Sequence, residues 1–149
     1  MGSACPDWAG PDTAVDHPLH AVTKLHHISL GVRNLAHAGA FYGAALGALG
    51  FRRVFEDDTA IGYGLMDDKD MPCLKLRPNA TPLGDGFYLA FAAPARAAVD
   101  AFHAAALRIG GKDNGAPGLR PEYGQLYYAA FLIDPDGHRI EAVLNAPPG

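Results

Sequence analysis

Two adjacent histidines stand at the start of an apolar run, in the segment "KLHHISLGV" at residues 24–32. Histidine ligates divalent metals through its neutral ring and exchanges protons near neutral pH, so His26 or His27 could serve metal-assisted or acid–base chemistry. The residues that follow alternate between apolar and small or polar types, which predicts a β-strand. His27 then lies on the face opposite the apolar side chains. His26 lies on the apolar face, where we expect a structural role.

The composition excludes several other kinds of chemistry. Cys5 and Cys73 have neither the spacing of a metal finger nor the number needed for a disulfide framework. The net charge is −4 and Lys and Arg do not cluster, so neither nucleic acid nor an anionic membrane surface is an expected partner. We see no secretory signal and no apolar run of membrane-spanning length, and we expect a cytoplasmic protein.

The elements that position the histidines belong to one domain. A chain of 149 residues can bury one substantial core, and its 49% hydrophobic content is that of an ordinary globular protein. We expect this domain to span residues 23–149, after a Pro-, Gly- and Asp-rich tail at residues 1–22.

Two helical segments of this domain resemble each other. Apolar spacing predicts helices near residues 35–48 and 95–109. The first contains "FYGAALGALG" and the second "FHAAALRIGG", and these two stretches align at an offset of 61 residues. Short strand-like segments accompany each helix. We therefore predict an α+β fold made of two β-α-β-β-β units, at about residues 24–78 and 86–146.

The same repeat pairs residues that could do chemistry. Without a gap, the offset carries His27 to Tyr88 on the first strand of each unit. With a small insertion, it carries Lys75 to Glu141 on the last strand of each unit. The apolar neighbours of these four residues should cover the helices, so all four should point to the opposite face of the sheet.

One long segment of the second unit lacks any period. "GKDNGAPGLRPEYGQ", residues 111–125, reads as a loop, and loops of this length in a compact domain are often functional. We expect a lid or pocket wall with Arg120, Glu122 and Tyr123 as candidate contacts, and a contact between two subunits is the alternative.

The motifs at the two ends of the domain resemble a known family. "HISLGV", the helix that contains "FY" and ends in "LG", and the hairpin "DPDGHRIEAV" are similar to the glyoxalase/bleomycin-resistance/extradiol-dioxygenase family, the vicinal oxygen chelate superfamily. The resemblance runs from about residue 25 to residue 145. It implies paired βαβββ units whose sheets form a cup that holds the site. It also implies a homodimer.

The resemblance implies metal ligands on the first and last strands of each unit. Carried over to this chain, those positions are His27, Lys75, Tyr88 and Glu141. His27 and Glu141 match the family, whereas Lys75 departs from its usual carboxylate and Tyr88 from its usual histidine. The implied cofactor is a divalent metal such as Zn, Ni, Mn or Fe, or none.

The two departures leave three arrangements open. A catalytic divalent metal normally has about three protein ligands, and an ammonium group beside it is repulsive. Tyr88 or water could complete a metal shell with His27 and Glu141. Alternatively, Lys75 could replace the metal and pair with Glu141. Both residues could also be solvated at the rim of the cup.

Further side chains are candidates for ligand binding. Strand alternation sends three of them to the concave face: Cys73, Arg77 and Arg139. Cationic side chains there would suit a ligand that carries a carboxylate, phosphate or enolate. Several tyrosines could line an aromatic pocket: Tyr63, Tyr123, Tyr127 and Tyr128.

Three functions remain compatible with these residues, since one fold hosts many activities. The first is a binding protein that holds a small, anionic or oxygen-rich molecule. The second is a metal-dependent lyase, isomerase or dioxygenase that uses His27 and Glu141 as ligands. The third is metal-free acid–base catalysis, with Glu141 as the base and Lys75 or Tyr88 as the electrophile.

Overall fold

The structure is a computed structural model that describes residues 25–66 and 71–148 of the chain. The tail expected at residues 1–22 and Cys5 lie outside the described residues. No helix in the described part of the chain is long and apolar enough to cross a membrane.

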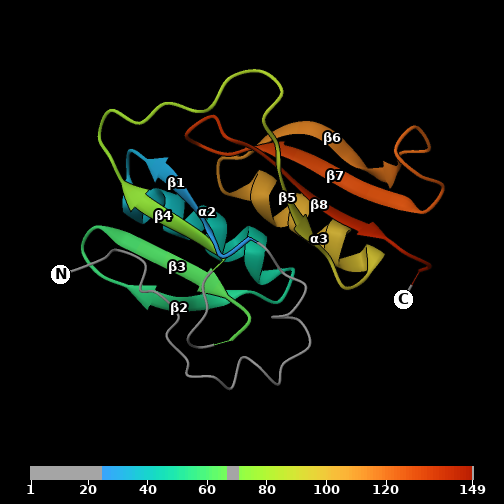
Figure 1. Cartoon of the computed structure of the whole chain (residues 1–149), viewed down its shortest axis with the longest axis horizontal. Coiled ribbons are helices and arrows are strands. Elements are labelled where there is room, and N and C mark those ends of the chain that lie inside the picture. The colour runs from blue at the N-terminus through green and yellow to red at the C-terminus, as the bar shows by residue number, and fades with distance from the viewer. Residues whose placement is uncertain (1–24, 67–70, 149) are drawn as a thin grey trace.

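Within the described residues, ten elements follow one another in two matching series (Figure 1). The first unit consists of β1 (Ile28–Val32), α2 (Leu35–Gly47), β2 (Arg52–Glu56), β3 (Ala60–Gly64) and β4 (Pro72–Leu76). The second consists of β5 (Leu89–Ala92), α3 (Arg96–Arg108), β6 (Lys112–Leu119), β7 (Tyr127–Ile133) and β8 (Arg139–Asn145). This confirms the α+β fold with two β-α-β-β-β units.

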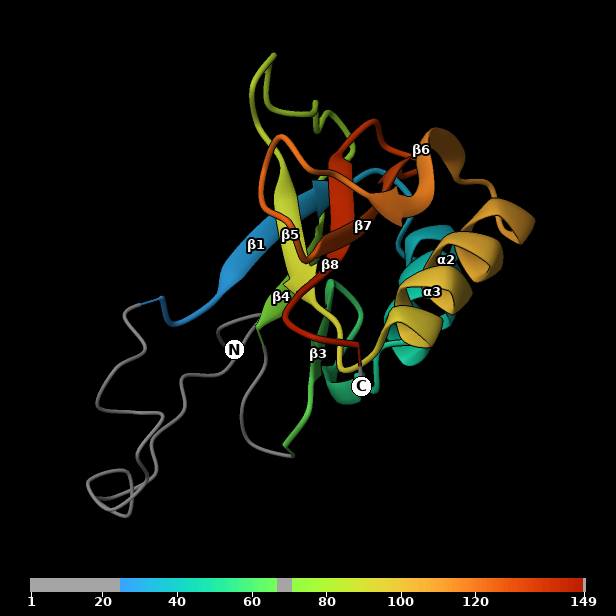
Figure 2. The same cartoon turned by 90° about the vertical axis from the view of Figure 1, so that its right-hand side faces the viewer.

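The two sheets have the same topology. Their strand orders are β1-β4-β3-β2 and β5-β8-β7-β6, with a parallel pair at the start of each and antiparallel pairs elsewhere. Figures 1 and 2 show both helices on one side of the sheets. We call the other side of each sheet its open face. Both open faces lie on the side of the chain away from the helices (Figure 2).

The core lies between the helices and the sheets. Apolar strand residues alternate toward it, as the sequence pattern predicts, among them Leu30, Leu74, Phe91 and Ile140. Helix α2 begins at its cap, where the side chain of Asn34 accepts a hydrogen bond from the backbone N–H of His37. Helices α2 and α3 also pack against each other.

The segment expected as a long loop at residues 111–125 is mostly a strand, so that prediction is wrong. Strand β6 pairs with β7, but its register shifts between Asp113 and Gly115 and again between Gly115 and Gly118. Each bulge adds an unpaired residue, which destroys the two-residue period by which a strand is recognised. Only residues 120–126 connect β6 to β7.

The turn between β7 and β8 makes hydrogen bonds that connect the second unit to the first. The hydroxyl of Tyr42 on α2 donates to Asp134 Oδ2 at 2.5 Å, and Asp134 Oδ1 accepts from the backbone N–H groups of Asp136 and His138. Burial raises the pKa of Asp134, and the bond from Tyr42 opposes that rise. A carboxylate can remain in this apolar interface because three donors surround it.

Two further contacts complete this junction. Arg33 donates from its backbone N–H and its Nε to Asp136 Oδ1, at 2.9 and 3.0 Å. His138 Nε2 donates to the carbonyl oxygen of Gly31 at 2.8 Å. The "DPDGH" motif, which the sequence indicates only as a hairpin, therefore holds the two units together.

Candidate functional site

Glu141 lies on the open face of the second sheet, between two neighbouring strands. It stands opposite Phe131 of β7 and Ala90 of β5 in the strand register. Because side chains alternate along a strand, Tyr127 of β7 and Arg139 of β8 share this face with Glu141. The pairing of β7 with β8 brings residues that are 14 apart in the sequence into direct contact.

Glu141 is paired with a phenol. The hydroxyl of Tyr127 donates to Glu141 Oε2 at 2.5 Å, a charge-assisted bond. Glu141 is only 6% exposed. Burial raises the pKa of the Glu141 carboxyl, and the bond from Tyr127 and the charge of Arg120 act against that rise. Burial and the bond to Glu141 raise the pKa of Tyr127 to about 12, so the phenol keeps its proton at neutral pH.

Aromatic rings surround this pair. The Tyr88 and Phe131 rings meet edge to face with centroids 5.9 Å apart, and the Tyr123 and Tyr127 rings do so at 5.3 Å. Tyr88 is 46% exposed and its hydroxyl accepts a hydrogen bond from Asn114 Nδ2 at 3.4 Å. The face thus combines a carboxylate, phenolic hydroxyls and accessible ring surface.

A cation lies at the edge of the aromatic group. The guanidinium carbon of Arg120 is 5.2 Å from the centroid of the Phe131 ring, and its Nη2 donates to the carbonyl oxygen of Ala116 at 2.6 Å. Glycines make room for it: a Cβ at Gly115 would lie 2.9 Å from Phe131 Cδ2, and one at Gly118 would lie 3.1 Å from Arg120 Nη1. The bulged, glycine-containing β6 therefore lets Arg120 lie over the ring.

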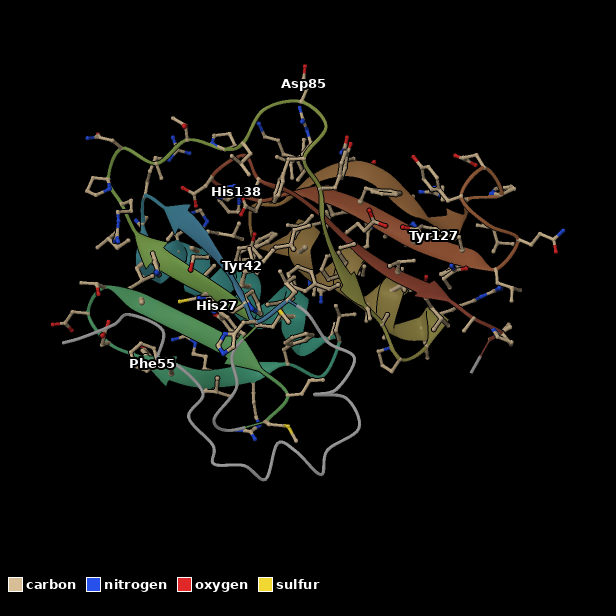
Figure 3. The ribbon with its side chains drawn as sticks, viewed as in Figure 1. His27, Tyr42, Phe55, Asp85, Tyr127 and His138 are labelled. Atoms are coloured by element: carbon tan, nitrogen blue, oxygen red, sulfur yellow. The ribbon has the colours of Figure 1, made fainter. Side chains whose placement is uncertain are left out.

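The candidate residues of the first unit lie on the other sheet. His27 precedes β1 by one residue, and its Nδ1 is 2.8 Å from His26 Nδ1. His26 is exposed, which corrects the expectation that it lies on the apolar face. Lys75 lies on β4, opposite Gly31 of β1. Figure 3 shows His27 over the first sheet and Tyr127 over the second.

The sequence profile of the glyoxalase/bleomycin resistance protein/dioxygenase superfamily matches residues 24–142. The chain belongs to this superfamily. No protein of curated function matches the chain by sequence.

Solved structures of the superfamily share its fold. A glyoxalase/bleomycin resistance protein from Albidiferax ferrireducens T118 is 34% identical, with a TM-score of 0.68 over 79% of this chain and 95% of that one. A bleomycin resistance determinant encoded on the transposon Tn5 is 25% identical, with a TM-score of 0.57 over 83% and 98%. A bleomycin-binding protein in complex with bleomycin is 24% identical, with a TM-score of 0.56 over 83% and 100%, which shows the fold alone.

The metal that the superfamily implies does not fit the residues of a single chain. Within residues 25–66 and 71–148 there is no group of three His, Cys, Asp or Glu side chains that could hold an ion. His27 and Glu141 belong to different units. Glu141 already accepts a hydrogen bond from Tyr127, and His27 lies against His26. We therefore derive no chemical step through a metal.

The expected contact between Lys75 and Glu141 is absent. The part of the chain that the structure describes contains no ion pair between them, and Glu141 binds Tyr127 instead. Lys75 and Glu141 lie on the last strand of their units but not at equivalent positions: Lys75 pairs with Gly31 and Glu141 with Ala90, whereas the 61-residue offset carries Gly31 to Ala92. The two residues belong to different sheets.

Two of the tyrosines predicted for the pocket lie under the helices. Tyr63 is buried and donates to the carbonyl oxygen of Gly39 on α2 at 2.9 Å. Tyr128 donates to Asp100 on α3 at 2.7 Å. Neighbouring residues on a strand face opposite ways, and these two tyrosines face the helix side rather than the open face.

The other predicted ligand-binding residues have mixed positions. Cys73 is fully buried, so its side chain is not accessible to a ligand. Arg139 Nη2 pairs with Asp85 at 3.2 Å. Arg77 is exposed and donates to the carbonyl oxygen of Leu76. The Tyr123 ring packs against Tyr127, which in turn binds Glu141. Glu122 is exposed in the same loop.

Sequence reasoning missed Phe131 and Asn114 as neighbours of the site. Alternation in "YYAAFLI" places Tyr127 and Phe131 on one face of β7, which the sequence alone indicates. Phe131 stands opposite Glu141 and Tyr127 opposite Asn145, which depends on the register between β7 and β8, and that register is not readable from either strand by itself.

Proposed function

We propose that this protein binds a small oxygen-rich molecule on the open face of its second sheet, around Glu141. The observation that supports this most directly is the Tyr127–Glu141 pair, which places a mostly buried carboxylate and a phenol among accessible rings. Buried polar groups beside apolar surface are typical of small-molecule sites, where the polar groups orient the ligand.

The groups on this face define what such a ligand would contain. A hydroxyl or amine of the ligand would donate to Glu141, where a hydrogen bond to a charged group contributes about 1.5–3 kcal/mol. A ring of the ligand would pack on Tyr88 and Phe131, where an aromatic pair adds about 0.5–1.5 kcal/mol beyond its buried area. A carboxylate or other anionic oxygen would pair with Arg120. The bleomycin resistance determinant on the same fold supports a binding role without identifying the ligand.

Acid–base catalysis is the second candidate. Burial raises the pKa of Glu141, which favours a carboxylate acting as a base near neutral pH. Tyr88, whose hydroxyl is accessible beside Phe131, is the candidate electrophile on the same face. Lys75, the other candidate, lies on the first sheet and does not contact this site.

Ligand titrations test the binding proposal. A panel of phenols, hydroxy acids and bleomycin is screened by thermal shift, and each positive compound is measured by calorimetry with wild-type protein. We expect Glu141→Gln and Tyr88→Ala each to weaken binding at least ten-fold, because they remove the acceptor and the ring surface. Tyr128→Phe is the matched control, since Tyr128 faces α3. A ligand whose affinity is unchanged in both site variants would place the binding site elsewhere.

A further inference from the structure

We propose that Tyr127 determines the selectivity of Glu141: its hydroxyl keeps the carboxylate as a hydrogen-bond acceptor and excludes divalent cations from it. This inference goes beyond the proposed function, because it concerns cations and holds whichever organic molecule the face binds. Three features of the described residues support it.

The first feature is the geometry at the carboxylate. Tyr127 lies 2.5 Å from Glu141 Oε2, and Glu141 is only 6% exposed. A divalent metal such as zinc requires a carboxylate oxygen at about 2.0–2.2 Å and at least two further ligands close by. The hydroxyl of Tyr127 takes one lone pair of Oε2, so an ion at Oε2 would have to approach from the remaining side of a carboxylate that is already mostly buried.

The second feature is that Tyr127 is held in place by the loop beside it. The backbone N–H of Tyr127 donates to the carbonyl oxygen of Gly124 at 3.2 Å, and its carbonyl oxygen accepts from the N–H of Arg120 at 2.8 Å. The ring also packs edge-on against Tyr123. The two hydrogen bonds fix the backbone of Tyr127 and the contact with Tyr123 restricts its ring, so the phenol is held beside Glu141.

The third feature is the set of groups around the carboxylate. Tyr88, which directly precedes β5 and packs against Phe131, is a phenol, and phenolic oxygen is a rarer metal ligand than imidazole nitrogen. Arg120 brings a positive charge to the same face, and this charge repels a second cation. The face thus offers an ion a mostly buried carboxylate with one oxygen already hydrogen-bonded, weak neighbouring ligands and a like charge.

Nickel titrations on protein purified without an affinity tag test this proposal. Tyr88→His first supplies a nitrogen ligand, and Tyr127→Phe is then added to remove only the hydroxyl. We expect the double variant to bind Ni²⁺ at least ten-fold more tightly than Tyr88→His alone, as measured by calorimetry. Adding Glu141→Gln to the double variant should abolish the gain. Tyr88→His with Tyr128→Phe is the matched control, which loses a phenol–carboxylate bond on the other face and should show no gain.

The outcomes are decisive in both directions. Equal Ni²⁺ affinity with and without the Tyr127 hydroxyl overturns the proposal, as does the absence of binding in both variants or a gain that survives Glu141→Gln. Thermal melting establishes that each variant folds. If Tyr127→Phe does not fold, the wild-type protein provides a second measurement: tight Ni²⁺ binding that Glu141→Gln removes overturns the proposal, and no such binding supports it. The organic-ligand titrations remain independent of this result.

Discussion

At the scale of single residues, this protein uses phenol–carboxylate hydrogen bonds in three different environments. Tyr127 binds Glu141 on the open face, Tyr128 binds Asp100 on the surface of α3, and Tyr42 binds Asp134 between the two units. The three bonds are chemically alike, but their contributions should differ, because a buried charge that loses a donor cannot recover it from water.

The Tyr42 bond should contribute most to stability. Tyr42 is fully buried, so Tyr42→Phe leaves the Asp134 carboxylate with one donor fewer and should lower the free energy of unfolding by about 1–3 kcal/mol. Tyr63→Phe is the comparison: its hydroxyl is also buried but donates to the neutral carbonyl of Gly39, and the Arg53 guanidinium beside it remains in contact with water, so the loss should be about 0.5–1.5 kcal/mol. Urea unfolding measures both values, and equal losses would contradict the importance of the charged acceptor.

At the scale of elements, glycines decide how the turns and the bulged strand are shaped. Gly137 in the turn between β7 and β8 has φ of +93°, and a Cβ there would lie 3.0 Å from Pro82 Cγ. Gly115 and Gly118 allow β6 to carry its bulges beneath Arg120. A side chain at any of these positions would disturb the turn that joins the units or the strand that supports the site.

The turn glycine provides a direct test of this role. Gly137→Ala should lower the free energy of unfolding by about 1–2 kcal/mol, because it adds a Cβ in a left-handed conformation against Pro82. Gly43→Ala on the exposed side of α2 meets only an ordinary contact at 3.9 Å and should stabilise the protein by up to about 1 kcal/mol. Denaturant unfolding measures the change in the free energy of unfolding for both variants. An unchanged free energy in Gly137→Ala would show that the turn tolerates a side chain.

At the scale of the whole molecule, one core spans both units, with α2 packed against α3. The polar contacts between the units are Tyr42–Asp134, Arg33–Asp136 and His138–Gly31. Large apolar side chains remain exposed around the loop that follows β6, at Leu119, Tyr123 and Leu126. Apolar side chains that gather on one surface often mark a contact with another protein.

The family resemblance implies a homodimer. We predict that two copies of the chain associate through this exposed apolar surface. Light scattering at tens of micromolar should give twice the chain mass of 15.7 kDa. Leu126→Asp should shift the distribution toward single chains, because it places a charge in the contact. Asp58→Asn, an exposed change in the turn between β2 and β3, is the control. A wild-type protein that remains at the mass of one chain contradicts the prediction.

The sequence by itself determined the elements of this protein and their order. The helices predicted near 35–48 and 95–109 are observed at Leu35–Gly47 and Arg96–Arg108, and the repeat correctly indicated two equivalent units. Such features arise from local periodicity, which each segment carries within its own residues. Strand β6 could not be recognised in this way because its bulges remove the period.

Only the tertiary structure decided which residues share a site. The sequence named Glu141 through the repeat and the family resemblance, but it paired that residue with Lys75, whereas the structure pairs it with Tyr127. Contacts of this kind depend on the register between β7 and β8 and on how one unit is set against the other. Both are fixed by packing between segments distant along the chain, such as Tyr42 against Asp134, and no single segment contains that information.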